Sequence, residues 1–203
     1  KLFVSQNCAA IPANLLESIL FGTVKGSYTG AENRPGIFEI ANGGTIFLDE
    51  INSMEISVQA KILKAIEEKK ITRIGGVAPI PIDVKIVSAI NENPIDCMEA
   101  GKLREDLFYR LSVVQLTLPL LKERRNDLFF LVNHFIGEYN ENMHRSIIGI
   151  DETVEEIFRS YDWPGNVREL KNVIEGAFNV TSSGFIQKKD RPESLLNAME
   201  RSQ

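Results

Sequence analysis

The feature that most restricts the fold is a short apolar run, Thr45–Leu48, that follows a glycine-rich turn and ends in two carboxylates, Asp49 and Glu50. A continuous apolar run of this length is typical of a strand buried on both faces of a parallel sheet. Three similar runs lie elsewhere in the chain: Leu2–Val4, Val84–Val87 and Val113–Leu116. Helical patterns separate the runs, and this alternation predicts an α/β fold with a parallel sheet over residues 1–118.

Beyond this region the pattern changes to helical spacing without further strand signals. Apolar residues recur every three or four positions in three stretches: Leu128–Tyr139, Val154–Tyr161 and Leu170–Ala177. Asp151 stands where an N-cap is expected, and Asn166 with Glu169 resembles a capping box. We therefore expect a small all-α lobe over residues 119–185 and a linker or frayed tail over residues 186–203.

Composition excludes several classes of protein. The chain carries 23 basic and 28 acidic residues, a net charge of −5, whereas dedicated nucleic-acid binders have a basic surplus. Two cysteines are too few for a disulfide framework, which favours a cytoplasmic location. No apolar run approaches the roughly 18–20 residues that cross a bilayer, so no membrane partner is expected. Because the chain opens on Lys1 inside an apolar run, we expect a fragment of a longer protein.

The two carboxylates after Thr45–Leu48 are candidate functional residues. Ligands of open α/β sheets bind beyond the carboxyl ends of the strands, where Asp49 and Glu50 would lie. One carboxylate could hold Mg²⁺ and the other could polarise an attacking water, as in the Walker B arrangement of nucleoside triphosphatases. The alternative is that both residues merely cap the following helix, and the motif alone leaves both interpretations open.

A second motif lies upstream of that strand. Residues 26–31 read Gly-Ser-Tyr-Thr-Gly-Ala, a composition typical of an exposed loop with an aromatic tip. This segment resembles the GAFTGA loop of sigma-54-dependent transcriptional activators, a branch of the AAA+ ATPases. Other segments resemble motifs of the same family in the same order: Asn7–Pro12, Leu15–Gly22, Gly44–Glu50, Leu103–Leu111 and Trp163–Leu170. The resemblance covers about residues 3–180 and implies an AAA+ type parallel sheet sandwiched by helices, with a C-terminal lobe.

The resemblance also implies roles at the nucleotide site. Asp49 would hold magnesium and Glu50 would orient the hydrolytic water, while Asn7 would restrain Glu50 until the nucleotide state releases it. Asn91 would be the first sensor, which contacts the γ-phosphate, and Arg168 would be the second sensor. These roles imply ATP and Mg²⁺ as the cofactors of the complete domain.

Two further groups of residues take their roles from the same resemblance. Arg104 and Arg110 correspond to arginine fingers that reach the neighbouring subunit's site, where a guanidinium suits phosphoryl charge. Without the resemblance, pairing with Glu105 and Asp106 on a solvated helix face would be the better interpretation. The contact loop for sigma-54 comprises Gly26, Ser27, Tyr28, Thr29, Gly30 and Ala31. A second loop near it comprises Arg73, Gly75 and Gly76.

The chain also departs from the family pattern. Ser27 and Tyr28 replace the usual alanine and phenylalanine, and Ile90 stands where a threonine commonly precedes the sensor asparagine. No GxxxxGK[ST] motif occurs in the 203 residues. The family's phosphate-binding loop is expected upstream of Lys1, so we expect this chain alone to be inactive.

The resemblance implies that the parent protein hydrolyses ATP in a hexameric or heptameric ring. Its loops would remodel the closed complex of sigma-54 RNA polymerase, and a domain outside this chain would bind enhancer DNA. Two alternatives stay open: a regulatory or interaction fragment that does not hydrolyse ATP, and a different AAA+ remodeller.

Overall fold

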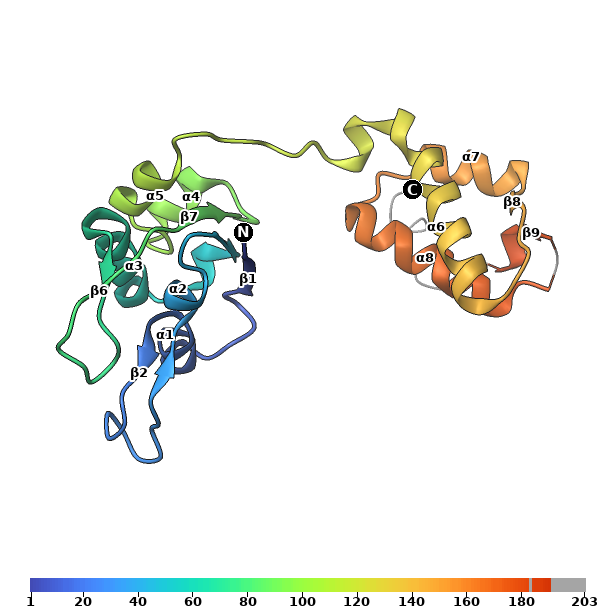
Figure 1. The fold of residues 1–203 in the computed structure, drawn as a ribbon. Helices are drawn as coiled ribbons and strands as arrows, with labels where there is room; N and C mark the ends of the chain where they lie inside the picture. Colours follow the sequence, from blue (N-terminus) through green and yellow to red (C-terminus); the bar gives the residue numbers. More distant parts are fainter. Residues whose placement is uncertain (183, 191–203) are drawn as a thin grey trace. The chain divides into compact units, whose positions relative to one another are not determined.

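A computed structural model of the chain describes residues 1–182 and 184–190. The chain divides into two compact units, Lys1–Gln115 and Leu116–Gln203, which we call unit 1 and unit 2. Both are drawn in Figure 1. Among the described residues, no helix is long and apolar enough to cross a membrane.

Unit 1 is built on a three-stranded parallel sheet. Its strands, in spatial order, are β1 (Phe3–Asn7), β4 (Thr45–Asp49) and β7 (Lys85–Ser88). The central position of β4 explains its continuous apolar sequence: Ile46 and Leu48 are fully buried on one face. The other face of the sheet carries Phe3 and Val87, which are 62% and 40% exposed. The three predicted strands 2–4, 45–48 and 84–87 thus exist, with bounds shifted by up to three residues.

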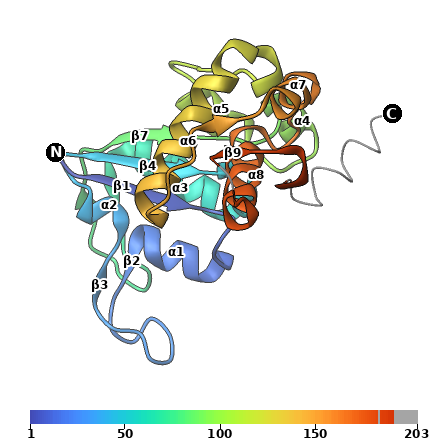
Figure 2. The same cartoon turned by 90° about the vertical axis from the view of Figure 1, so that its right-hand side faces the viewer.

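Helices and two short hairpins complete unit 1. The helices are α1 (Ala13–Phe21), α2 (Ile37–Ile40), α3 (Ile56–Glu68), α4 (Pro94–Glu99) and α5 (Glu105–Leu111), with a 3-10 turn η1 (Ile51–Ser53). The hairpins pair β2 (Gly22–Thr23) with β3 (Arg34–Pro35), and β5 (Lys70–Ile71) with β6 (Ile80–Pro81). Residues of α1, α3 and α5 share one hydrophobic core with β4. Figures 1 and 2 show the chain between β2 and β3 projecting away from the rest of the unit.

The strand predicted at Val113–Leu116 is wrong. These residues form no strand, and Val113, Val114 and Leu116 are 78–85% exposed. A β-branched run forms a strand only beside another strand, and none of the described strands pairs with this segment. The segment lies instead at the boundary between the two units.

Unit 2 is mainly helical. Its elements are η2 (Leu121–Glu123), η3 (Arg125–Asp127), α6 (Leu128–Met143), β8 (Gly149–Ile150), α7 (Glu152–Ser160), α8 (Asn166–Val180), β9 (Phe185–Ile186) and η4 (Lys188–Asp190). Its separate core includes Trp163, Phe158 and Phe178. The parallel pair of β8 and β9 was missed by the sequence analysis, because two-residue strands carry no periodic signal.

Of the two predicted N-caps, Asp151 is confirmed and Asn166 is wrong. Asp151 caps α7, since its Oδ1 accepts the Val154 N–H at 2.8 Å. Asn166 does not cap α8, because its Oδ1 accepts the distant N–H of Leu121 at 2.8 Å.

The tail expected over 186–203 is described only as far as Asp190, and this part is folded: Asp190 is 4% exposed and accepts the Gln187 N–H. Residues 191–203 lie outside the described residues.

Candidate functional site

The carboxyl edge of the sheet brings Asn7 and Asp49 together, because they are register partners on β1 and β4. Asn7 Oδ1 accepts the N–H groups of Ala9 and Ala10 at 2.9 and 3.0 Å. This fixes the orientation of the amide, so that its NH₂ group donates to Asp49 Oδ2 at 3.4 Å. The resemblance implies that Asn7 restrains Glu50; in the described structure the Asn7 NH₂ group donates to the neighbouring Asp49.

Glu50 follows β4 in a left-handed conformation, with φ 54° and ψ 49°. A non-glycine residue in this region costs on the order of 1–3 kcal/mol, and Glu50 shares a positive φ with Lys69, His144, Trp163 and Asn166. The backbone holds it there, since Ala89 N–H donates to Leu48 and Ile51 N–H donates to Ala89. The Glu50 side chain has no hydrogen bond or ion pair within the described part of the chain. It is therefore available to a ligand at the sheet edge.

The carboxylates at this edge affect the pKa of Cys8, which is buried directly after β1. Burial, and then the nearby carboxylates Asp49 and Glu50, raise the pKa of the Cys8 thiol to about 12. The thiol therefore stays protonated at neutral pH, which excludes a thiolate nucleophile here.

Asn91 follows β7 at the same edge and is tied to a residue that the sequence analysis missed. Asn52, in η1, is 5% exposed and donates from Nδ2 to Asn91 Oδ1 at 2.9 Å. The same Nδ2 donates to Glu92 Oε1 at 3.2 Å, while Asn52 Oδ1 has no partner in the described structure. Nothing in the sequence distinguished Asn52 from an ordinary turn residue. Ile90, before Asn91, packs against the hydrophobic core.

The two expected finger arginines lie at opposite ends of α5. Arg104 is the N-cap residue, and its Nε and Nη2 donate to both carboxylate oxygens of Asp106 at 2.9 and 2.6 Å. The Arg104 guanidinium lowers the pKa of Asp106, chiefly through these hydrogen bonds. Arg110 lies in the last turn, exposed, and its side chain has no partner within the described residues. With Tyr109, Arg104 lines a surface hollow of about 450 Å³.

The loop at residues 26–31 lies at the tip of the β2–β3 hairpin. Gly26 and Gly30 have φ of 86° and 83°, a backbone conformation that favours glycine, so both ends of the tip depend on this residue type. Tyr28 is 52% exposed and Thr29 is exposed. Ala31 is buried. The aromatic tip is thus presented to solvent while the base of the loop is anchored.

The second loop contacts the base of the first. Ile74 N–H donates to Gly22 and Val24 N–H donates to Ile74, at 2.9 and 3.1 Å. A Cβ on Gly75 would come within 2.4 Å of Ser27 Cβ, so only glycine allows this approach. Arg73 donates from Nε and Nη2 to Glu39, both at 2.7 Å. The two loops are therefore joined at their bases.

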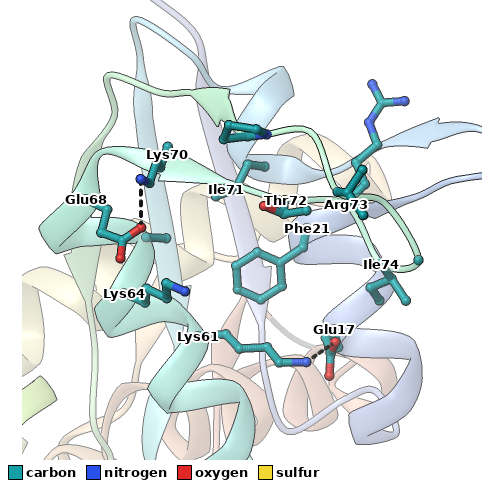
Figure 3. Close-up of a pocket in the computed structure, with 14 residues that line it drawn as sticks. Glu17, Phe21, Lys61, Lys64, Glu68, Lys70, Ile71, Thr72, Arg73 and Ile74 are labelled. Atoms are coloured by element: carbon teal, nitrogen blue, oxygen red, sulfur yellow. Dashed lines mark hydrogen bonds and ion pairs between the residues drawn. The ribbon is translucent and has the colours of Figure 1, made fainter.

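The second loop also forms one wall of a cleft of about 580 Å³ between α1 and α3 (Figure 3). Phe21 lies at its floor, and ion pairs of Lys61 with Glu17 and of Lys70 with Glu68 border it. Most lining charges are thus already paired within the chain.

Arg168 lies on α8 in unit 2, exposed and without a side-chain partner in the part that the structure describes. Its neighbour Glu169 is structural: Oε2 accepts the Gly165 N–H at 2.8 Å, and Oε1 accepts the Tyr161 hydroxyl at 2.9 Å. The two acceptor oxygens fix the first turn of α8 and leave Arg168 free to contact a ligand.

A parallel sheet with carboxylates at its carboxyl edge, followed by a helical unit, is the architecture of an AAA+ domain. Solved structures support this assignment: NtrX from Brucella abortus, in complex with ADP, matches with a TM-score of 0.88 at 31% identity. The match covers 97% of this chain and 44% of NtrX, and the ATP complex of NtrX matches with the same TM-score.

Sequence comparison identifies the family. Residues 1–117 match the family described as the Sigma-54 interaction domain, and residues 122–203 match the AAA+ ATPase lid domain. The chain therefore belongs to the sigma-54 interaction domain family.

Two curated relatives illustrate this membership. The transcriptional activator RocR of Bacillus subtilis is 53% identical over 177 residues, which cover 87% of this chain and 38% of RocR. UacR of Escherichia coli, named as a putative uric acid sigma-54-dependent transcriptional regulator, is 48% identical over 200 residues. That match covers 97% of this chain and 34% of UacR, so the chain spans about a third of the relatives' length.

Proposed function

We propose that this chain is the ATP-hydrolysing part of a cytoplasmic, sigma-54-dependent transcriptional activator. One observation carries the proposal: Asp49 and Glu50 stand at the carboxyl edge of the parallel sheet, and neither has a cationic partner in the described structure. Ligands of open α/β sheets bind at this edge, and Mg²⁺ is commonly held there by one or two carboxylates. Family membership supports the proposal, and NtrX was solved with ATP and with ADP.

The residues present fit a magnesium nucleotide. Carboxylate oxygens are preferred ligands of Mg²⁺, and Asn7 donates to Oδ2 of Asp49, which leaves Oδ1 open. A bound magnesium nucleotide would supply the transferable phosphoryl group and the charge of the metal. Asp49 would hold the metal, and Glu50, with its strained backbone and unpaired carboxylate, would orient a water and accept its proton. Asn91 and Arg168 would contact the phosphates.

The remaining residues act between subunits and on the partner. Arg104 and Arg110 would reach the nucleotide of a neighbouring subunit in a ring of six or seven copies, where guanidinium groups stabilise phosphoryl charge. Tyr28 and Thr29 would contact sigma-54 with their exposed side chains. Because the loop at Arg73–Gly76 is joined to the base of the first loop, the two would move together.

Hydrolysis is tested in an extended chain, in which a segment of a family member that carries a GxxxxGK[ST] motif is fused before Lys1. This supplies the phosphate-binding loop expected for the family. Glu50→Gln should keep nucleotide affinity and lose about 10²–10⁴-fold in turnover, because the carboxylate acts on water. Glu55→Gln, an exposed glutamate at the start of α3, is the matched control and should turn over ATP normally. Turnover of Glu50→Gln within about threefold of the parent would reject the role.

A further inference from the structure

Gln59 on α3 is a fully buried polar residue with no role in the site described so far. Its side chain is 0% exposed, which is costly for an amide unless its groups are hydrogen-bonded. Nε2 donates to the carbonyls of Met54 and Lys102 at 3.0 and 2.7 Å. Oε1 accepts the backbone N–H of Arg104 at 2.9 Å. All three partners are backbone groups, so Gln59 binds to chain segments and not to particular side chains.

These bonds join two segments that are distant in sequence. Met54 precedes α3, whereas Lys102 and Arg104 flank Leu103, which is 4% exposed and anchors the turn before α5. Gln59 and Arg104 are 45 positions apart. The bond to the N–H of Arg104 fixes the residue at which α5 begins, and with it the point from which the Arg104 side chain projects.

Arg104 is held at both ends. Gln59 holds its backbone N–H, and Asp106 holds its guanidinium through two hydrogen bonds. A long side chain reaches a target in another subunit reproducibly only when its Cα is fixed, because its own rotamers are many. The ion pair of Arg104 with Asp106 lies at the surface, whereas the Gln59 side chain that accepts the Arg104 N–H is fully buried.

The same turn is linked to the carboxyl edge of the sheet. Lys102 Nζ donates to both oxygens of Glu92 at 3.0 and 2.8 Å. Glu92 accepts from Asn52, which also donates to Asn91. The turn that Gln59 holds is therefore also connected to Asn91, through Glu92 and Asn52.

We propose that Gln59 is a positioning residue for Arg104: its amide fixes the backbone from which Arg104 reaches a neighbouring subunit's nucleotide. The inference rests on the proposed function, in which Arg104 acts in trans. Gln59 itself touches no reacting group. A residue that only satisfied the two carbonyls would stabilise the unit without a selective effect on Arg104.

The first experiment uses the 203-residue chain and measures amide hydrogen exchange. Gln59→Leu removes all three bonds, so the Arg104 amide should exchange roughly tenfold faster relative to core amides of α3. Gln59→Glu keeps an oxygen that accepts the Arg104 N–H, and should retain that protection although it repels the two carbonyls. Val58→Ala, a buried residue of the same helix, is the control and should change all amides alike. Equal loss of Arg104 protection in Gln59→Glu and Gln59→Leu would overturn the inference, and Gln59→Met, of similar length and without the three bonds, replaces Gln59→Leu if that variant does not fold.

The second experiment measures ATP turnover in the extended chain. Gln59→Leu should lower kcat about tenfold or more and leave KM for ATP within about threefold, because the subunit's own site is intact. Mixing it with Glu50→Gln subunits, which carry a normal Arg104, should restore turnover at the Gln59→Leu sites. Gln59→Glu alone should keep most of the turnover.

The outcomes separate this inference from the function on which it rests. If Arg104→Ala abolishes turnover while Gln59→Leu does not, the positioning role is wrong and the function stands. If Arg104→Ala leaves turnover unchanged, the assignment of Arg104 fails and the inference falls with it. Loss in Gln59→Leu without restoration by Glu50→Gln subunits would also overturn the inference, since it would show damage beyond Arg104.

Discussion

Glu39 and Arg73 form a two-point ion pair: Arg73 Nε donates to Oε1 and Nη2 donates to Oε2, each at 2.7 Å. The side chains are only 14% and 27% exposed, and the residues are 34 positions apart in the sequence. Glu39 lies on α2, shortly after the first loop, and Arg73 begins the second. The pair thus holds the bases of both loops in one arrangement.

Breaking this pair should destabilise unit 1 in a pH-dependent way. The Arg73 hydrogen bonds hold the pKa of Glu39 below its ordinary value of 4.5. A carboxylate with a lowered folded pKa stabilises the protein above its unfolded pKa and loses that contribution as pH falls through the folded value. Glu39→Gln should cost about 1–2 kcal/mol at pH 7, and the cost should shrink below pH 4.5.

Thermal unfolding at pH 7 and at pH 3 measures this difference. Glu32→Gln, in an exposed pair with Arg34, is the matched control and should have little effect at either pH. An equal destabilisation by Glu39→Gln at both pH values would contradict the expected linkage.

Thr29→Ala should separate partner binding from stability. Thr29 is exposed at the tip of the first loop, so the substitution should change the unfolding free energy by less than about 0.5 kcal/mol. It should leave ATP turnover of the extended chain intact and abolish capture of sigma-54 with a trapped nucleotide analogue. Thr153→Ala, an exposed threonine of α7, should affect neither quantity. A destabilised Thr29→Ala protein with normal capture would show that the tip only packs a turn.

The 203-residue chain alone should bind ATP weakly or not at all. It contains no GxxxxGK[ST] motif, and the backbone N–H groups and lysine of that motif are the main contacts of a triphosphate. Calorimetric titration with ATP and Mg²⁺ tests this, with the extended chain as the positive control. An affinity on the order of low micromolar would mean that Asp49, Glu50 and Asn91 suffice for binding.

Arg110→Ala should abolish ATP turnover of the extended chain, and subunits that carry an intact Arg110 should restore it. Arginine fingers typically contribute about 10³–10⁵-fold to kcat, so a loss of that size is expected. Glu50→Gln subunits are inactive at their own site but carry Arg110, so mixed assemblies should regain turnover. Two inactive variants that stay inactive when mixed would show that Arg110 acts within its own subunit or only in folding.

The sequence predicted the elements well where the signal is local. The run Thr45–Leu48 is the central strand, the helical stripe of 128–139 lies in α6, and that of 154–161 ends one residue beyond α7. The apolar run at Val113–Leu116 was misread, because strand formation needs a neighbour that composition cannot supply. Asn166 was misread for a related reason, since its oxygen bonds to Leu121 across 45 positions.

What the sequence by itself determined is the order of the three sheet strands and the main helices, the placement of Asp49 and Glu50 after a buried strand, and the family. These follow from residues that are adjacent or share one face of a helix or strand. Only the tertiary structure decided the left-handed backbone of Glu50, the pairing of Glu39 with Arg73, and the bond of Gln59 to Arg104. These features depend on contacts between distant segments, because each side chain is oriented by groups that reach it only after the sheet, the hairpins and α3 have packed.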